Sequence, residues 1–173
     1  MKAEEVMTRR VVTCRTDQDL GHAAALMWEN DCGSIPVVDS DERLVGILTD
    51  RDVCMGAFTQ GRSLRDLRAS GSMARTVITC EASDSLDEVM RSMAEYRVRR
   101  IPVVDGERHL LGMISIGDVV RAAHRAGSKG KKSYAGAILD TLATICEPRF
   151  EPQAALPSGK NARPRSAKKK AKA

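Results

Sequence analysis

The sequence contains no long apolar run, no closely spaced cysteine pair and no secretory signal. Its apolar stretches span only a few residues each, far short of the roughly 20 that a transmembrane helix needs. Residues 1–20 include Glu4, Glu5, Asp17 and Asp19 in place of an apolar signal core. The five cysteines are odd in number and lack CxxC spacing, which favours a reducing compartment over a disulfide framework. We therefore expect a cytoplasmic protein with no membrane partner.

Histidine and catalytic groupings are also scarce. His22, His109 and His124 form no pair at helical spacing, so the sequence offers little support for a zinc site. No nucleophile and base occur at a spacing that indicates an active site. The sequence therefore predicts a protein that is not an enzyme and requires no cofactor or metal.

The charges that are present are unevenly divided along the 173 residues, whose formal net charge is +5. Residues 1–126 carry 17 basic and 20 acidic side chains, a net charge of −3. Residues 127–173 carry 11 basic and 3 acidic side chains, a net charge of +8. The acidic part has about 125 residues, which is enough for one ordinary domain with a buried core.

Residues 127–149 are predicted to form a hinge and a helix. The segment from Gly127 to Lys132 has the composition of a flexible basic hinge. An amphipathic helix is expected from Tyr134 to about Cys146, with an apolar stripe made of Ile138, Leu139, Leu142 and Ile145. This stripe fits packing on the body of the chain, and it equally fits docking on a second subunit or a partner.

Residues 150–173 are rich in Pro, Ala and Lys and are predicted to form a disordered basic tail. Seven positive charges and no acid follow Glu151, a composition that attracts nucleic acid nonspecifically. No aromatic residue follows Phe150, so the tail has no side chain on which bases stack. A tail that only improves solubility fits this composition equally well.

The body of the chain is an internal repeat. Shifted by 66 residues, 7–53 aligns with 73–119 without a gap, and 17 of 47 positions are identical. Chance would give about three identities at a typical residue frequency of roughly 6%. The body is therefore a duplicated unit, and a site in one copy predicts a related site in the other.

Each copy is predicted to fold as β-α-β-β-α, so the fold class is mixed α/β (α+β). Apolar spacing and turn residues place the first copy in 1–60, a linking helix in 61–71 and the second copy in 72–126. Asp17 and Asp84 are expected to cap the first long helix of each copy. Because a core of fewer than about 60 residues is marginal, we expect the copies to pack as a pseudo-twofold pair. A cleft would lie between them and be duplicated by the symmetry.

Several spaced motifs in each copy resemble one known family. The first copy contains V-M-T, V-V-T, I-P-V-V-D and L-V-G-I-L-T-D-R-D, and the second contains V-I-T, I-P-V-V-D and L-G-M-I-S-I-G-D. Over about residues 1–125 the chain resembles a tandem pair of cystathionine β-synthase (CBS) domains, also called a Bateman module. The resemblance implies a regulatory module that binds AMP, ADP, ATP or S-adenosylmethionine between the copies. It also implies a homodimer and a regulated protein partner.

The resemblance also assigns site residues. The family's G-x-x-[ST]-x-x-D segment holds the ribose, which implies roles for Thr49 and Asp52 in the first copy and for Ser115 and Asp118 in the second. An ionised Asp on the first turn of a helix is independently a good acceptor for a diol. The same residues also fit a purely structural role as helix caps. The adenine contacts implied by the family are Val12, Thr13, Ile35 and Pro36, with Ile78, Thr79, Ile101 and Pro102 in the second copy.

The copies differ in their arginines. Arg97, Arg99 and Arg100 precede Ile101-Pro102, whereas the first copy offers only Arg51, next to Asp52. Arginine beside a nucleotide cleft pairs with phosphate, so we expect the second site to accept more phosphate charge and Asp118→Ala to abolish binding. A solvated basic face paired with Glu95 or Asp87 is the alternative interpretation.

Other features favour structural interpretations, and two further functions stay open. Cys14 and Cys80 are equivalent in the repeat and are expected to be small buried residues of the core. Trp28 is expected to pack or to lie at an interface. Besides a regulatory nucleotide sensor, the sequence is compatible with a nucleic-acid-associated protein that uses its tail and with a ligand-free dimerisation scaffold.

Overall fold

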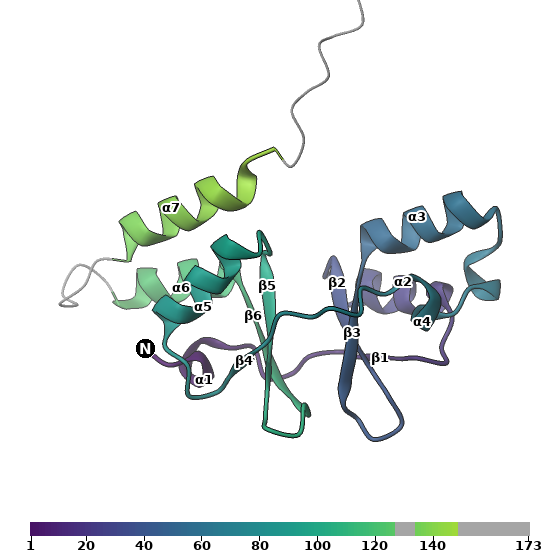
Figure 1. Cartoon of the computed structure of the whole chain (residues 1–173), viewed down its shortest axis with the longest axis horizontal. Helices are drawn as coiled ribbons and strands as arrows, with labels where there is room; N and C mark the ends of the chain where they lie inside the picture. Colours follow the sequence, from purple (N-terminus) through teal and green to yellow (C-terminus); the bar gives the residue numbers. More distant parts are fainter. Residues whose placement is uncertain (127–133, 149–173) are drawn as a thin grey trace, which may run out of the picture.

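The computed structural model describes residues 1–126 and 134–148 (Figure 1). The predicted hinge at 127–132 and the predicted tail at 150–173 lie outside the described residues. Two three-stranded sheets lie side by side, with helices packed against each of them (Figure 1). The predicted α+β fold of two repeats is confirmed. Within the described part of the chain, no helix is both long and apolar enough to cross a membrane.

The two sheets have the same topology. The first contains β1 (Cys14–Arg15), β2 (Ser34–Val38) and β3 (Leu44–Thr49), and the second contains β4 (Cys80–Glu81), β5 (Arg100–Val104) and β6 (Leu110–Ser115). In each sheet the first strand runs parallel to the second, and the second pairs antiparallel with the third. Pairing of the first strand begins at Cys14 in the first sheet and at Cys80 in the second.

Each repeat also contains two long helices, one between its first and second strands and one after its third strand. They are α2 (Leu20–Glu29) and α3 (Asp50–Gln60) in the first, and α5 (Leu86–Glu95) and α6 (Ile116–Ala126) in the second. The predicted caps Asp17 and Asp84 were wrong. Asp19 caps α2 by accepting the backbone N–H of His22 at 2.8 Å, and Ser85 caps α5. The cap therefore lies two residues later than expected in α2 and one residue later in α5, while the buried apolar faces begin at Leu20 and Leu86 as expected.

The single linking helix predicted over 61–71 was wrong. The structure has a 3₁₀ turn, Leu64–Asp66, and a separate short helix, α4 (Ala69–Ser72). Leu67 lies between them with extended backbone and a buried side chain, and its carbonyl accepts the Leu20 N–H at 2.8 Å. Burying Leu67 in the first core interrupts the helix.

The short helix that begins each repeat packs on the other repeat. α1 (Ala3–Val6) contributes to the core built around α5 and β5, and α4 contributes to the core built around α2 and β2. Thr8 and Met113 exchange two backbone hydrogen bonds of 2.9 Å, and Ala74 and Ile47 do the same at 2.9 and 3.0 Å. The chain therefore crosses twice between the two halves of the molecule (Figure 1). Each half combines the sheet and long helices of one sequence copy with the short first helix of the other copy.

The predicted C-terminal helix is α7 (Ala135–Cys146), which packs along α5 and also contacts α6 (Figure 1). Ile138, Thr141 and Ile145 form its buried face. Leu139 was expected on this face, but it is 68% exposed. Just beyond the helix, Glu147 Oε2 accepts from Arg97 Nη2 at 2.6 Å. The sequence left open whether this helix packs on its own chain or docks on another protein, and in the structure α7 packs on its own chain.

The equivalent cysteines Cys14 and Cys80 are buried in the two cores. Burial raises the pKa of the Cys14 thiol to about 11 and that of Cys80 to about 12, and nearby carboxylates add to both shifts. We expect iodoacetamide at pH 8 to modify the exposed Cys54 and Cys146 at least a hundredfold faster than these two thiols. Peptide mass spectrometry of the folded protein measures the rates. Comparable labelling of Cys14 and Cys54 would contradict the buried arrangement.

Candidate functional site

A cleft of about 700 Å³ lies between the two repeats. Its walls come from the start of β2, the junction of β3 and α3, the crossing segment at 74–78 and the start of β5. Ile145 of α7 lies at its edge. The lining residues are Gly33, Ser34, Ile47, Thr49, Asp50, Arg51, Asp52, Ala74, Thr76, Val77, Ile78, Arg97, Val98, Arg99, Arg100, Pro102 and Ile145.

The cleft combines residues of both copies. Sequence reasoning placed the arginines of the second copy with Ser115 and Asp118. This was wrong, because Arg99 and Arg100 line the same cleft as Thr49 and Asp52 of the first copy. The crossing segment at 74–78 causes this arrangement, since it pairs with Ile47 and so carries the second copy to the edge of the first sheet.

Thr49 and Asp52 form a reciprocal cap at the start of α3. Thr49 Oγ1 and the Thr49 N–H both donate to Asp52 Oδ2, at 2.7 and 2.9 Å, and the Asp52 N–H donates to Thr49 Oγ1 at 3.2 Å. The structural role predicted as the alternative is therefore present. Asp52 Oδ1 accepts no hydrogen bond from any residue that the structure describes. Asp52 Oδ1, on the first turn of α3, is therefore available to accept a hydrogen bond from a ligand hydroxyl.

Four guanidinium groups and two carboxylates border the cleft. Arg97 is held by Glu147, whereas Arg51, Arg99 and Arg100 form no ion pair within residues 1–126 and 134–148. The backbone N–H of Arg51 donates to Asp50 Oδ1 at 2.7 Å, which fixes the first turn of α3. Unpaired guanidinium groups at one cleft favour an anionic ligand, because Arg binds phosphate or carboxylate in a bidentate manner.

Ser34 is a cleft residue that sequence reasoning missed. It is only 7% exposed, and its Oγ has no hydrogen-bond partner among the described residues. A buried hydroxyl without a partner costs free energy, so a ligand that reaches it gains a favourable hydrogen bond. The only signal in the sequence was its position before Ile35-Pro36, where the second copy has Arg100 instead.

Only some of the residues predicted to contact adenine lie in the cleft. Ile78 and Pro102 line the cleft beside Val77, which gives it an apolar side. Ile35 and Ile101 are 0% exposed and lie within the two cores. Their side chains pack the sheets. Thr79 lies in a separate, smaller depression beside Asp105, and Val12, Thr13 and Pro36 do not line the main cleft.

Ser115 and Asp118 lie at the position related to Thr49 and Asp52 by the repeat, but Asp118 is already engaged. Ser115 Oγ donates to Oδ2 at 2.5 Å, and Oδ1 accepts from Arg121 Nη2 at 2.5 Å and from Thr8 Oγ1 at 3.3 Å. Burial alone would raise the pKa of Asp118, but the Ser115 and Arg121 hydrogen bonds outweigh it and lower the pKa. The two acids therefore differ: only Asp52 has an oxygen without a described partner.

Comparison with known proteins settles the family. The family model described as CBS domain matches residues 3–56 and 64–125. The chain belongs to the CBS domain family. The CBS domain-containing protein YhcV of Bacillus subtilis is 34% identical over 116 residues, which are 67% of this chain and 81% of that protein. Hypoxic response protein 1 of Mycobacterium tuberculosis is 33% identical over 69% of this chain and 82% of its own length.

Solved CBS structures share the fold. The CBS-domain containing protein ATU1752 of Agrobacterium tumefaciens has a TM-score of 0.63 and 32% identity, over 70% of this chain and 98% of its own. The CBS domain pair of protein MJ0100, in complex with 5-methylthioadenosine and S-adenosyl-L-methionine, has a TM-score of 0.63 and 25% identity, over 72% and 97%. Inosine-5'-monophosphate dehydrogenase of Methanocaldococcus jannaschii is 32% identical over 157 residues, which are 90% of this chain but only 29% of that protein.

Proposed function

We propose that this CBS pair is a regulatory module that binds an adenine nucleotide in the cleft between its repeats. The observation that carries the proposal is that Asp52 lines the same cleft of about 700 Å³ as Arg99 and Arg100, which form no ion pair with any described residue. This volume lies within the range of small-molecule sites. The adenosyl ligands of the MJ0100 pair support the same ligand class.

The distribution of groups orients the ligand. The Asp52 carboxylate accepts hydrogen bonds from the ribose hydroxyls, and the apolar side at Ile78 and Pro102 contacts the base. Arg99 and Arg100 bind the phosphate groups. The excess of guanidinium groups favours ATP or ADP over S-adenosylmethionine, whose sulfonium is cationic. Ser115 and Asp118 stay a prediction for a second site, which needs the ligand to displace Thr8 or Arg121.

Isothermal titration of the full chain with ATP, AMP and S-adenosylmethionine tests the proposal. We expect saturable binding that is tightest for ATP and weakens as salt rises, because exposed charges are screened. No heat with any of the three would overturn the proposal and favour the ligand-free scaffold. Binding of DNA that depends on residues 150–173 would instead support the nucleic-acid alternative.

The end of α7 offers a route from the cleft to a partner protein. Ile145 borders the cleft, and Glu147 holds Arg97, another cleft residue. A phosphate in the cleft competes with Glu147 for Arg97 and so weakens the attachment of α7 to α5. We propose that this release is the signal that a partner detects. The homodimer implied by the resemblance stays a prediction, which sedimentation velocity measures.

Glu147→Gln is therefore expected to tighten ATP binding about two- to fivefold, the range of one partly exposed ion pair. Calorimetry measures the change. Glu95→Gln is the matched control, because Glu95 is an exposed acid near the end of α5 that does not line the cleft. Equal affinities for both variants and the parent protein would contradict the competition for Arg97.

A further inference from the structure

Asp52 has a counterpart in the second copy, and the two aspartates differ in the surroundings of one oxygen atom. Ser115 Oγ and the Ser115 N–H both donate to Asp118 Oδ2, at 2.5 and 2.8 Å, and the Asp118 N–H donates to Ser115 Oγ at 3.2 Å. This reciprocal cap at the start of α6 repeats the cap that Thr49 and Asp52 form on α3. The other oxygen, Oδ1, accepts two hydrogen bonds on Asp118 but none from a described residue on Asp52.

Two side chains hold Asp118 Oδ1. Arg121, one turn further along α6, donates through Nη2 at 2.5 Å, and Thr8 donates through Oγ1 at 3.3 Å. Thr8 is held in place by its two backbone hydrogen bonds with Met113. Arg121 folds back over the first turn of α6, where its Nη1 atom would lie 3.4 Å from a Cβ added at Gly117. A carboxylate oxygen has two lone pairs, so the two donors use the full capacity of Oδ1.

The internal repeat shows that both donors are particular to the second copy. Ala74 occupies the position of Thr8, and Met55 occupies the position of Arg121. Neither alanine nor methionine has a side chain that donates a hydrogen bond. Ala74 lines the first cleft without reaching a polar group, and Met55 does not line it. The two copies therefore differ at the two positions that decide whether the aspartate has an oxygen available to a ligand.

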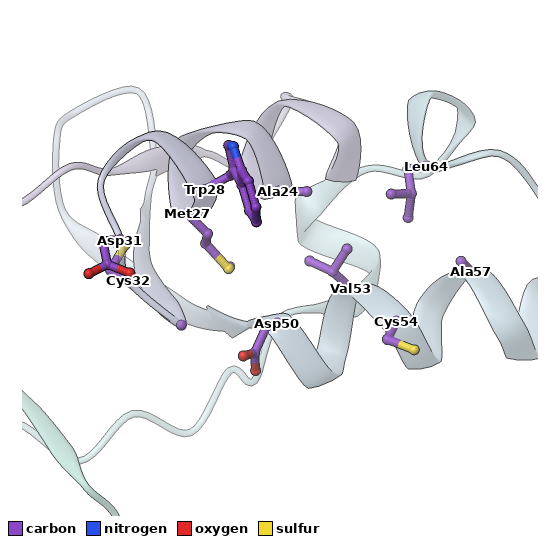
Figure 2. A pocket seen from close by; sticks show the side chains of 11 residues that line it. Ala24, Met27, Trp28, Asp31, Cys32, Asp50, Val53, Cys54, Ala57 and Leu64 are labelled. Atoms are coloured by element: carbon purple, nitrogen blue, oxygen red, sulfur yellow. The ribbon is translucent and has the colours of Figure 1, made fainter.

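The groove between α2 and α3 contains no substitute for Arg121 either. It has a volume of about 620 Å³ and lies beside the first turns of α3 (Figure 2). Its lining residues include two acids, Asp31 and Asp50, and no basic residue. The engaged aspartate is thus a property of the second copy.

We propose that Thr8 and Arg121 block the second ribose acceptor, so that the chain binds one nucleotide and not two, an inference that rests on the nucleotide binding proposed for Asp52. A ribose hydroxyl has to replace Arg121 on Asp118. This exchange is unfavourable, because the guanidinium carries a positive charge that the hydroxyl lacks. Asp118 is only 7% exposed, so little room is left for a ligand to reach the carboxylate while both donors stay in place.

The first copy supplies the substitutions that test this role. Thr8→Ala and Arg121→Met place its residues at the equivalent positions of the second copy and remove both donors. The probe is adenosine, because it contains the ribose diol and the base and needs no arginine to hold a phosphate. Asp52→Ala is present in every protein of this comparison, so that binding in the first cleft is weakened.

Equilibrium dialysis of radiolabelled adenosine against the full chain measures the effect. We expect the protein with Thr8→Ala and Arg121→Met to bind about 10- to 100-fold more tightly than Asp52→Ala alone, the range for one charge-assisted hydrogen bond. Arg121→Met without Thr8→Ala is expected to give most of this gain, since the Thr8 bond is the longer of the two. Arg125→Met is the matched control: Arg125 is exposed one turn later on α6, and its replacement leaves the affinity unchanged.

Asp118→Ala, added to the protein that lacks both donors, is expected to remove the gain. A gain that persists in Asp118→Ala would overturn the proposal, as would an unchanged affinity in variants that circular dichroism shows to be folded. Two ATP molecules bound per chain of the parent protein in calorimetry would also overturn it. If the parent protein binds no ATP but the protein without Thr8 and Arg121 binds adenosine through Asp118, the function proposed for the first cleft fails and the blocking role stands.

Discussion

Gly112→Ala is expected to lower the free energy of unfolding by about 2 to 3 kcal/mol, the upper range for forcing atoms into a packed site. An alanine Cβ at this position would lie 2.8 Å from the Thr8 carbonyl oxygen and 2.7 Å from Met7 Sδ. The Thr8 backbone has little freedom to withdraw, because its N–H and C=O are both bonded to Met113. The substitution therefore pushes the crossing N-terminal segment away from β6.

Thermal and urea unfolding followed by circular dichroism measure this effect. Gly106→Ala is the matched control, because its Cβ would meet nothing within 4 Å, and we expect a change within about 0.5 kcal/mol. Gly46→Ala is expected to be intermediate, since its nearest backbone atom, the Ala74 oxygen, lies at 3.2 Å and the other neighbours belong to the flexible Met73 side chain. Equal midpoints for Gly112→Ala and Gly106→Ala would show that α1 does not pack on the second repeat as described.

The identity of Gly46 and Gly112 also shows what the sequence was able to predict. The motif around each glycine made the internal repeat visible. The strands β2 and β5 and the helices around them were predictable as well, because their sequence patterns are local. The close approach behind each glycine was not predictable. The close approach depends on a segment from the other copy, which pairs with the strand that contains the glycine. Because both copies carry the same motif, the sequence does not show which of the two sheets each crossing segment joins.

The same ambiguity limited the prediction of the site. The Thr49 and Asp52 pair was found from its motif, and its capping geometry follows from three-residue spacing. Its arginine partners were assigned to the wrong half, since proximity in sequence placed Arg99 and Arg100 beside Ser115. Ser34 was missed because a buried hydroxyl without a partner is a property of packing. The prediction that Leu139 belongs to the buried face of α7 was also wrong. An exposed apolar residue is common on protein surfaces, so the apolar pattern alone does not show which side chains of the helix are buried.

Asp52→Ala is expected to weaken ATP binding about 10- to 100-fold, which corresponds to the loss of a charged hydrogen-bond acceptor of about 1.5 to 3 kcal/mol. Asp52 Oδ1, which accepts no hydrogen bond from a described residue, is the acceptor assigned to the ribose, and the alanine side chain offers no replacement. The remaining guanidinium groups still attract phosphate, so residual binding is expected to depend more steeply on salt. Calorimetry at two salt concentrations measures both effects.

Asp52 also caps α3, so a loss of binding has to be separated from a loss of stability. The Ser85 and Glu88 pair forms the same reciprocal cap on α5 and does not line the cleft. Glu88→Ala is therefore the matched control: both variants are expected to lose about 1 kcal/mol of stability, but only Asp52→Ala loses ATP affinity. Asp118→Ala locates the site. Because Asp118 is bonded to Thr8 and Arg121, we expect this variant to unfold more easily while its ATP affinity changes less than threefold. If Asp118→Ala abolishes binding and Asp52→Ala does not, the nucleotide binds at the second site predicted around Ser115 and Asp118.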